Sequence, residues 1–252
     1  MTEFMDQNNQ ADIAIEGLSK SFGTQKVLDG FSLSVAHGET VAVLGRSGTG
    51  KSVLLRLLIG LQKPDAGHIR IQGQEINGLE VKPLNEIRKK IGFLFQQGAL
   101  YDSLTVEENV EFPLSRHTTL SAQERKSRAL ELLESVGMKD DMDKMPSQIS
   151  GGMQKRVGLA RALALGPAIV FLDEPTAGLD PITAAEIGAL ISQLQEKHKM
   201  TSLVVTHDLH GAKHFANRVV MLDHGKVLFE GRFDDLQKST DSFVMQYLKD
   251  AA

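Results

Sequence analysis

The segment at residues 45–52, GRSGTGKS, limits what this chain can fold into more than any other part of the sequence. It fits the pattern G-x-x-x-x-G-K-[ST], in which a glycine-rich turn is followed at once by a lysine and a hydroxyl side chain. The apolar run TVAVL precedes it and VLLRLLIGL follows it, so the pattern predicts a strand, a tight loop and a helix in direct succession. Backbone N–H groups of such a loop can surround phosphate oxygens.

We therefore expect residues 45–52 to bind the phosphates of a nucleotide. In this prediction Lys51 reaches the β- and γ-phosphates, and the Ser52 hydroxyl coordinates Mg²⁺. The predicted phosphate loop consists of Gly45, Arg46, Ser47, Gly48, Thr49, Gly50, Lys51 and Ser52. The alternative is an ordinary glycine-rich turn with an exposed lysine, and the strand and helix on either side argue against it.

Short apolar runs alternate with longer helical patterns along most of the chain, which is typical of an α/β fold with a parallel sheet. The predicted strands lie at residues 40–44, 91–95, 168–172, 202–205 and 219–222. Helical patterns follow residue 51 and cover residues 183–197. The runs TVAVL and AIVFL are apolar throughout, which predicts central strands covered by helices on both faces.

Near the N-terminus the pattern changes. Residues 11–22, 27–35 and 67–76 alternate apolar and polar side chains between glycine-rich turns, which predicts a small antiparallel sheet.

The stretch from about residue 97 to about residue 165 is nearly all helical in pattern, and Ser121 with Glu124 has the spacing of a capping box. We therefore expect a single domain over residues 11–252 with a helical subdomain at about 97–165. A loose polar tail at residues 1–10 precedes it.

The composition excludes several classes of protein. The 252 residues include 28 Lys+Arg against 32 Asp+Glu, and the net charge of -4 argues against a chain that grips nucleic acid through a strongly basic face. Cysteine is absent, which excludes disulfides, thiolate metal sites and a cysteine nucleophile. No apolar run approaches the roughly 18 residues of a spanning helix, and the polar N-terminus lacks a secretory signal. We therefore expect a cytoplasmic protein.

A second chemical motif ends the predicted strand AIVFL, where Asp173 and Glu174 follow in the sequence AIVFLDEP. Parallel strands present their carboxyl ends at the ligand-binding edge of a sheet. We expect Asp173 to hold the Mg²⁺ shell and Glu174 to polarise an attacking water. Cleavage of a phosphoanhydride depends mainly on positioning that water and on neutralising charge at the γ-phosphate.

The sequence ISGGM at residues 149–153 resembles the signature of ABC-transporter ATPase subunits. The chain also carries the other motifs of the family, in the order that the family has them. Phe22 resembles the aromatic residue that stacks on adenine, and Gln96 resembles the glutamine of the Q-loop. Asp180, in AGLD, resembles the D-loop aspartate, and His207 resembles the switch histidine. The resemblance covers nearly the whole chain and implies the ABC ATPase fold: a P-loop NTPase parallel-sheet core, an N-terminal antiparallel β-subdomain and an inserted α-helical subdomain.

The same resemblance implies hydrolysis of ATP with Mg²⁺. It assigns catalytic roles to Glu174, His207 and Gln96. The resemblance also implies that Gln96 binds the metal together with Ser52 and Asp173.

In this family two cassettes face each other head to tail, and Ser150, Gly151 and Gly152 of one contact the nucleotide in the phosphate loop of the other. The N–H groups at the start of a helix suit a γ-phosphate. The resemblance also makes Asp180 part of the nucleotide site and implies two partners: a second copy of this chain and transmembrane permease subunits. The family usually has glutamine where this chain has Met153, so helix packing and a specific role both stay open for that residue.

Within the family, residues 96–114 and the sequence SGGM resemble the ATPases of Mla/MCE-type lipid transport systems, with small Gly98 and Ala99 after the Q-loop glutamine. This implies phospholipid transport across the cell envelope by a chain that is peripheral on the inner face of the cell membrane, with an MCE-type lipid-binding subunit as a further partner. A small regulatory subunit stays open. The alternatives are an ATPase of another importer or of a lipoprotein-release system, and a soluble ABC protein that acts on ribosomes or DNA.

We also expect the surface at residues 96–109 to dock the permease. Its apolar residues are Leu100, Tyr101, Leu104 and Val106. The alternative is that these side chains belong to the core of the helical subdomain. Charge reversal at Glu108 is predicted to uncouple hydrolysis from transport.

Two other clusters carry competing interpretations. His210 and His214, four residues apart, could share one helix face as a zinc pair, but no glutamate stands where a metalloprotease motif requires it. The basic run RKK at residues 88–90 fits a solvated helix end better than a nucleic-acid contact. We expect no nucleic-acid partner.

Overall fold

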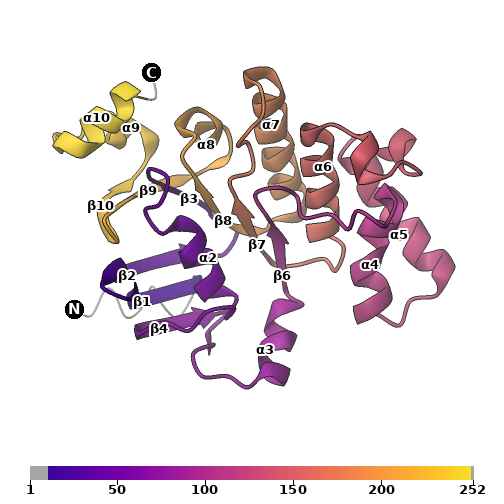
Figure 1. The fold of residues 1–252 in the computed structure, drawn as a ribbon, viewed down its shortest axis with the longest axis horizontal. Helices are drawn as coiled ribbons and strands as arrows, with labels where there is room; N and C mark the ends of the chain where they lie inside the picture. The colour runs from indigo at the N-terminus through magenta and orange to yellow at the C-terminus, as the bar shows by residue number, and fades with distance from the viewer. Residues whose placement is uncertain (1–10, 251–252) are drawn as a thin grey trace.

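The chain folds into two sheets with helices packed around them (Figure 1). The computed structural model describes residues 11–250, so the tail expected at residues 1–10 lies outside the described residues. The first sheet has the strand order β2-β1-β4-β5 and is antiparallel. Its strands are β1 (Ala11–Phe22), β2 (Gln25–Ala36), β4 (Ala66–Ile71) and β5 (Gln74–Glu75). The predicted small antiparallel sheet is thereby confirmed.

The second sheet has the order β10-β9-β3-β8-β7-β6. Its strands are β3 (Thr40–Leu44), β6 (Ile91–Leu94), β7 (Ile169–Asp173), β8 (Thr201–Thr206), β9 (Arg218–Asp223) and β10 (Lys226–Gly231). All neighbours pair in parallel except β10, which runs antiparallel to β9. Every residue of β3 and β7 is buried, which confirms the prediction of central strands from their unbroken apolar runs.

The helices connect the strands and cover both faces of the parallel sheet. They are α2 (Lys51–Leu58), α3 (Val81–Arg88), α4 (Val106–His117), α5 (Ala122–Ser135), α6 (Gly151–Ala162), α7 (Pro181–His198), α8 (Leu209–Phe215), α9 (Phe233–Leu236) and α10 (Ser242–Asp250), with short 3₁₀ turns at Lys139–Asp141 and Pro146–Gln148. In Figure 1, α4, α5 and α6 gather at one end of the molecule, and the antiparallel sheet lies away from them.

Two hydrophobic cores lie on opposite faces of the parallel sheet, because successive side chains of a strand point to opposite sides. Phe171 belongs to the core shared with α2 and the antiparallel sheet. Leu172, the next residue, belongs to the core shared with α4, α5, α6 and α7. The ends of the parallel strands are therefore fixed from both faces, which gives the loops at those ends a rigid base.

Local signals set where the helices begin. Ser121 and Glu124 form the predicted capping box at the start of α5, since Ser121 accepts from the Glu124 N–H and the Glu124 carboxylate accepts from the Ser121 N–H. Helix α7 begins two residues before the predicted start, because Asp180 caps it and Pro181 occupies its first turn. Proline suits that position, where its missing N–H has no partner in the helix.

The part of the chain that the structure describes contains no helix with both the length and the apolar character needed to cross a bilayer.

Replacing Phe171 by alanine should destabilise the protein strongly. Its ring is among the largest fully buried side chains, and the T-shaped contact with Phe93 has a centroid separation of 6.5 Å. Truncation of a buried phenylalanine leaves a cavity that costs about 3–5 kcal/mol. Urea denaturation followed by circular dichroism measures the loss. The matched change Leu228→Ala, at an exposed position, should cost less than about 1 kcal/mol, and equal losses for the two variants would contradict the assignment of the core.

Candidate active site

The phosphate loop joins β3 to α2, as the sequence predicts. Gly50 caps α2 with φ of 100°, and a Cβ atom there would lie 2.7 Å from a methyl group of Val27. A Cβ at Gly45 would lie 2.5 Å from the carbonyl oxygen of Leu222. Both positions therefore require glycine, one for its left-handed backbone and both for lack of space.

Lys51 is buried at the first position of α2, and its ammonium group folds back over the loop. Nζ donates to the carbonyl oxygens of Gly45 at 2.7 Å and of Arg46 at 3.0 Å, and lies 3.4 Å from Oε1 of Glu174. Burial lowers the pKa of Lys51, and the charge of Glu174 acts in the opposite direction. The ammonium is therefore held between the loop and a carboxylate.

Ser52 and Asp173 meet beside this lysine. The Ser52 hydroxyl donates to Oδ1 of Asp173 at 3.0 Å, and burial raises the pKa of the Asp173 carboxyl group. Within residues 11–250 no group of three or more histidine or acidic side chains could hold a metal by itself. A single hydroxyl with a single carboxylate instead fits Mg²⁺, which keeps several waters and completes its shell with substrate phosphates.

Glu174 lies at the centre of the site. Its Oε2 accepts from the Thr206 hydroxyl at 3.0 Å and from the His207 N–H at 3.2 Å, and lies 2.8 Å from Nδ1 of the His207 ring. A carboxylate can only accept, so Nδ1 carries the proton in this pair. The Glu174 carboxylate is thus fixed by the end of β8 on one side and by Lys51 on the other.

Gln96 follows β6, one strand away from Glu174 in the sheet. The two backbones are joined by Lys155 of α6, whose ammonium donates to the carbonyl oxygens of Gln96 and Glu174, the latter at 2.9 Å. Burial lowers the pKa of Lys155 to about 8, although the neighbouring Asp173 and Glu174 carboxylates favour the charged form.

The remaining predicted residues lie on other elements. Ser150 caps α6 by accepting from the Met153 N–H at 3.3 Å, and Gly151 and Gly152 form the first turn. Asp180 caps α7 by accepting from the N–H groups of Ile182 and Thr183. Phe22 is exposed at the end of β1, and Lys20 lies over its ring. Among residues 11–250, no hydrogen bond or ion pair joins the signature glycines, Ser150, Asp180 or Phe22 to the phosphate loop.

Comparison with known proteins decides the family. A model described as ABC transporter matches residues 28–177, which include the phosphate loop, the signature and the carboxylates that follow β7. The chain belongs to the ABC transporter family. Domains of this family bind ATP with Mg²⁺ and hydrolyse it, and the matched residues include the predicted phosphate loop. Residues 45–52, which are predicted to bind the ATP phosphates, are called the ATP loop below.

Curated relatives agree with this membership. The chain is 43% identical over 220 residues to the methionine import ATP-binding protein MetN of Rhizobium johnstonii, which covers 87% of this chain and 60% of the relative. It is 41% identical over 236 residues to the "Probable ribonucleotide transport ATP-binding protein mkl" of Mycobacterium leprae, which covers 94% of this chain and 68% of the relative. The chain therefore spans about 60% of the length of the first of these relatives.

Solved ABC structures confirm the fold. The dimeric cassette MJ0796 bound to ADP and phosphate has a TM-score of 0.80 at 37% identity, over 87% of this chain and 98% of that chain. CbiO1 of Clostridium perfringens, part of an ABC transporter complex, has a TM-score of 0.83 at 28% identity, over 95% and 96% of the two chains. The predicted fold class is thus confirmed, whereas the named relatives do not single out lipid transport.

Two contacts of this ABC cassette were not predicted from the sequence. The first is the pair of hydrogen bonds from Lys155 to the Gln96 and Glu174 carbonyls. Lys155 belongs to no motif identified in the sequence, and it is 4% exposed. The second is α10. Its Tyr247 hydroxyl donates to the His207 carbonyl at 2.7 Å, and Asp250 pairs with Arg46 of the ATP loop at 3.0 Å. Helix α10 therefore contacts both the ATP loop and the backbone of His207.

Three residues singled out from the sequence have structural roles. Met153 packs against the hydrophobic core, which supports the packing interpretation. Arg88 is half-buried and donates to the carbonyl oxygens of Ile59 and Gly60, just after α2, whereas Lys90 of the same basic run is exposed. Glu108 completes a capping box with Thr105 at the start of α4.

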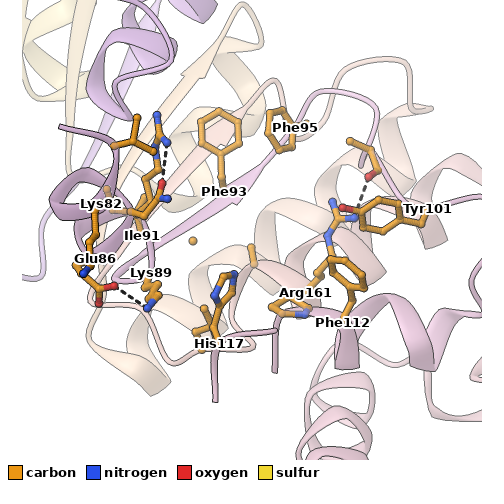
Figure 2. A pocket seen from close by; sticks show the side chains of 18 residues that line it. Lys82, Glu86, Lys89, Ile91, Phe93, Phe95, Tyr101, Phe112, His117 and Arg161 are labelled. Atoms are coloured by element: carbon orange, nitrogen blue, oxygen red, sulfur yellow. Dashed lines mark hydrogen bonds and ion pairs between the residues drawn. The ribbon is translucent and has the colours of Figure 1, made fainter. Parts of the chain in front are cut away.

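A groove of about 920 Å³ lies beside the Gln96 loop of the cassette, between α3, β6, α4 and α6 (Figure 2). Phe93 and Phe95 pack with ring centroids 4.3 Å apart, and Tyr101 lies over Phe112 at 4.7 Å. Phe95 and Tyr101 are among the exposed large hydrophobic side chains. Basic side chains also line the groove, namely Lys82, Arg88, Lys89, His117 and Arg161.

Proposed function

We propose that this chain is the ATP-hydrolysing subunit of an ABC transporter. One observation carries the proposal: Lys51, Ser52, Asp173, Glu174 and His207 come from three neighbouring strand ends and contact one another within hydrogen-bond or ion-pair distance. Phosphate release from Mg²⁺-ATP by the purified chain tests it. Release that stops when EDTA removes the metal supports the proposal, and a chain that binds ATP but releases no phosphate contradicts it.

Each residue has a chemical task in this proposal. Mg²⁺, when bound at Ser52 and Asp173 with Gln96 as a further ligand, neutralises charge on the phosphates. Lys51 supplies a second positive charge to the same oxygens. Glu174 accepts a hydrogen bond from the attacking water and orients it, and the protonated Nδ1 of His207 holds the carboxylate in that orientation.

We propose that a second copy of this chain completes each site. Ser150, Gly151 and Gly152 open α6, where unpaired N–H groups and the positive end of the helix dipole suit a γ-phosphate. These N–H groups have no bond to the ATP loop of their own chain, so a partner is needed to bring a signature to that loop. Phe22 and Asp180 are proposed to contact the nucleotide from the edges of this composite site.

We propose that the aromatic groove beside Gln96 docks a transmembrane permease. Exposed aromatic side chains that gather in a groove mark interaction sites, and a short amphipathic helix can insert its apolar face between such rings. Of the four apolar residues predicted for docking, only Tyr101 lines this groove. Val106 is instead fully buried in the core, and Leu100 packs against that core. Reversal of charge at Glu108 would remove the Glu108 half of the capping box of α4, so it would not test docking alone.

Val81 provides a sharper test of docking. It is 69% exposed and lines the groove from α3, so Val81→Glu places a charge against the docked apolar face without touching the ATP site. We expect recovery of the permease with the tagged chain to fall by about tenfold or more, while the ATPase activity of the isolated chain stays within about twofold of the parent.

Leu61→Glu is the matched control, because Leu61 is 57% exposed and lies outside the groove. Purification from membranes followed by mass spectrometry makes the comparison. Undiminished recovery with Val81→Glu, or equal losses with both variants, would show that the groove is not the docking surface.

The cargo that we propose is a glycerophospholipid, with an MCE-type lipid-binding protein in the complex. The support is the resemblance of residues 96–114 and of SGGM to Mla/MCE-type ATPases. Tight packing explains why Gly98 is small: a Cβ atom there would lie 3.2 Å from the carbonyl oxygen of Gln154. In this proposal the chain works at the inner face of the cell membrane, where ATP is available.

Mass spectrometry of proteins and lipids in the purified complex tests the cargo. Co-purification with a lipid-binding subunit and phospholipid supports the proposal. Recovery with an amino-acid permease and no lipid would favour methionine import, the function named for one relative, and would refute phospholipid transport.

A further inference from the structure

We propose that Lys155 is a positioning residue of the ATPase reaction: from α6 it holds the backbones of Gln96 and Glu174 together, and so links the signature helix to the carboxylate that orients the water. This inference rests on the proposed function. It concerns a residue that the phosphate-binding motifs do not include.

Lys155 is a buried cation whose ammonium group is hydrogen-bonded to two backbone carbonyls. Nζ donates to the carbonyl oxygens of Gln96 and Glu174, which lie just beyond the ends of the adjacent strands β6 and β7. A lysine that served only to pack would be replaced at lower cost by an apolar side chain, since burial of a charge is unfavourable unless it is paired and hydrogen-bonded. Here the ammonium bridges two strand ends at the site of chemistry.

The backbone of Glu174 needs such a constraint. Its φ of 48° lies in the left-handed region, which non-glycine residues adopt at a cost and which persists only where the surroundings hold it. The N–H of Glu174 donates to the carbonyl of Val205 at 2.8 Å, and the carbonyl of Glu174 accepts from Lys155. Both peptide groups are therefore fixed, and this conformation directs the side chain to Thr206 and His207.

The same helix holds the loop that follows Gln96. Arg161, on α6 with Lys155, donates to the carbonyl oxygens of Gly98 at 2.7 Å and of Ala99 at 2.8 Å. A Cβ atom at Gly158 would lie 2.7 Å from Leu94 and 3.4 Å from the Cα of Gly98, so the loop lies flat against α6. Helix α6 and the loop at residues 96–99 are thus tied together at both ends.

The consequence is a direct connection between three parts of the protein. Ser150 caps the start of helix α6, and the proposed function places it against the ATP of a second copy. Arg161, near its other end, lines the aromatic groove (Figure 2). A shift of α6 caused by either partner would move the Glu174 carbonyl, because Lys155 binds it. The position from which the Glu174 carboxylate orients the attacking water therefore depends on the position of α6.

The test compares three variants of the full chain. Lys155→Met removes both hydrogen bonds and keeps an unbranched side chain that is one atom shorter. Lys155→Arg keeps the charge and the donors. Arg156→Met is the matched control, because Arg156 is the next residue of α6 and contacts the Val136 carbonyl and Glu186, away from Gln96 and Glu174.

Steady-state phosphate release gives kcat, and a fluorescent ATP analogue gives nucleotide affinity. For Lys155→Met we expect kcat to fall by about 10- to 100-fold, the size of effect that a small misplacement of a catalytic group produces. Affinity should change by less than about twofold, because Lys51 and the ATP loop are unaltered. Lys155→Arg should recover most of kcat, and Arg156→Met should keep it. If Lys155→Met does not fold by circular dichroism, Lys155→Gln replaces it in the same comparison.

Two results would overturn the inference. One is a folded Lys155→Met or Lys155→Gln variant with kcat close to that of the parent. The other is a loss of kcat matched by an equal loss of affinity, or by an equal loss in Arg156→Met, which would mean general damage to the helix. A parent chain without phosphate release would refute the proposed function and this inference together, so the two failures are distinguishable.

Discussion

Glu174→Gln is expected to lower ATP turnover by about 10²- to 10⁴-fold, the usual contribution of a group that takes a proton or orients water in the transition state. The glutamine keeps the shape of the side chain and can still accept from Thr206. It is neutral, so it orients water less strongly and cannot take a proton. ATP binding should stay within about threefold of the parent, since the ATP loop is unchanged.

Phosphate release under saturating ATP, together with equilibrium binding, separates these two effects. Glu196→Gln is the matched control, because it makes the same chemical change at an exposed position of α7. Turnover of the Glu174 variant at the parent's rate would remove this carboxylate from the mechanism.

Lys51→Ala is expected to lose ATP affinity and turnover together. Its ammonium lies between the loop carbonyls and Glu174, at the place where the β- and γ-phosphates are proposed to bind. Loss of a charge-assisted contact costs about 1.5–3 kcal/mol, which corresponds to about 10- to 150-fold weaker binding. Turnover should fall at least as much, because the transition state carries the same charge.

Titration calorimetry with ATP and no hydrolysis, in the Glu174→Gln background, gives the affinity directly. Lys63→Ala provides the control, since Lys63 is exposed beyond the end of α2. If Lys51→Ala binds ATP as tightly as the control does, the assignment of this lysine to the phosphates is wrong.

Much of the site could be predicted because its chemistry fixes residue types at fixed spacing. The ATP loop needs glycine where the backbone turns left-handed or where no Cβ fits, and Gly50 meets both conditions. Asp173 and Glu174 end an apolar strand, and parallel strands bring such ends to one edge. The α/β class with a parallel sheet followed in the same way from the alternation of strand and helix patterns, whereas the ABC ATPase fold followed from the family resemblance.

The residues that escaped prediction act through long-range packing. Lys155 lies in a helix whose sequence is mixed, and only the packing of α6 against β6 and β7 buries its side chain. Tyr247 lies 40 positions from His207, whose carbonyl it binds, and no local pattern reports that distance. In contrast, the start of α7 could have been placed correctly, because Asp180 followed by Pro181 is a recognisable N-terminal helix signal.

Sedimentation velocity of Glu174→Gln, with and without Mg²⁺-ATP, tests whether two copies of the chain form the composite site. We expect dimers with ATP and monomers without it. Adding Ser150→Arg should keep the chain monomeric while it still binds ATP, since the large side chain blocks closure of the signature against the partner's loop. Ser121→Arg is the control: it removes the same kind of helix cap from α5 and should not prevent dimers. ATP-bound monomers of Glu174→Gln, or dimers that form equally well with Ser150→Arg, would show that a second copy does not complete the ATP site.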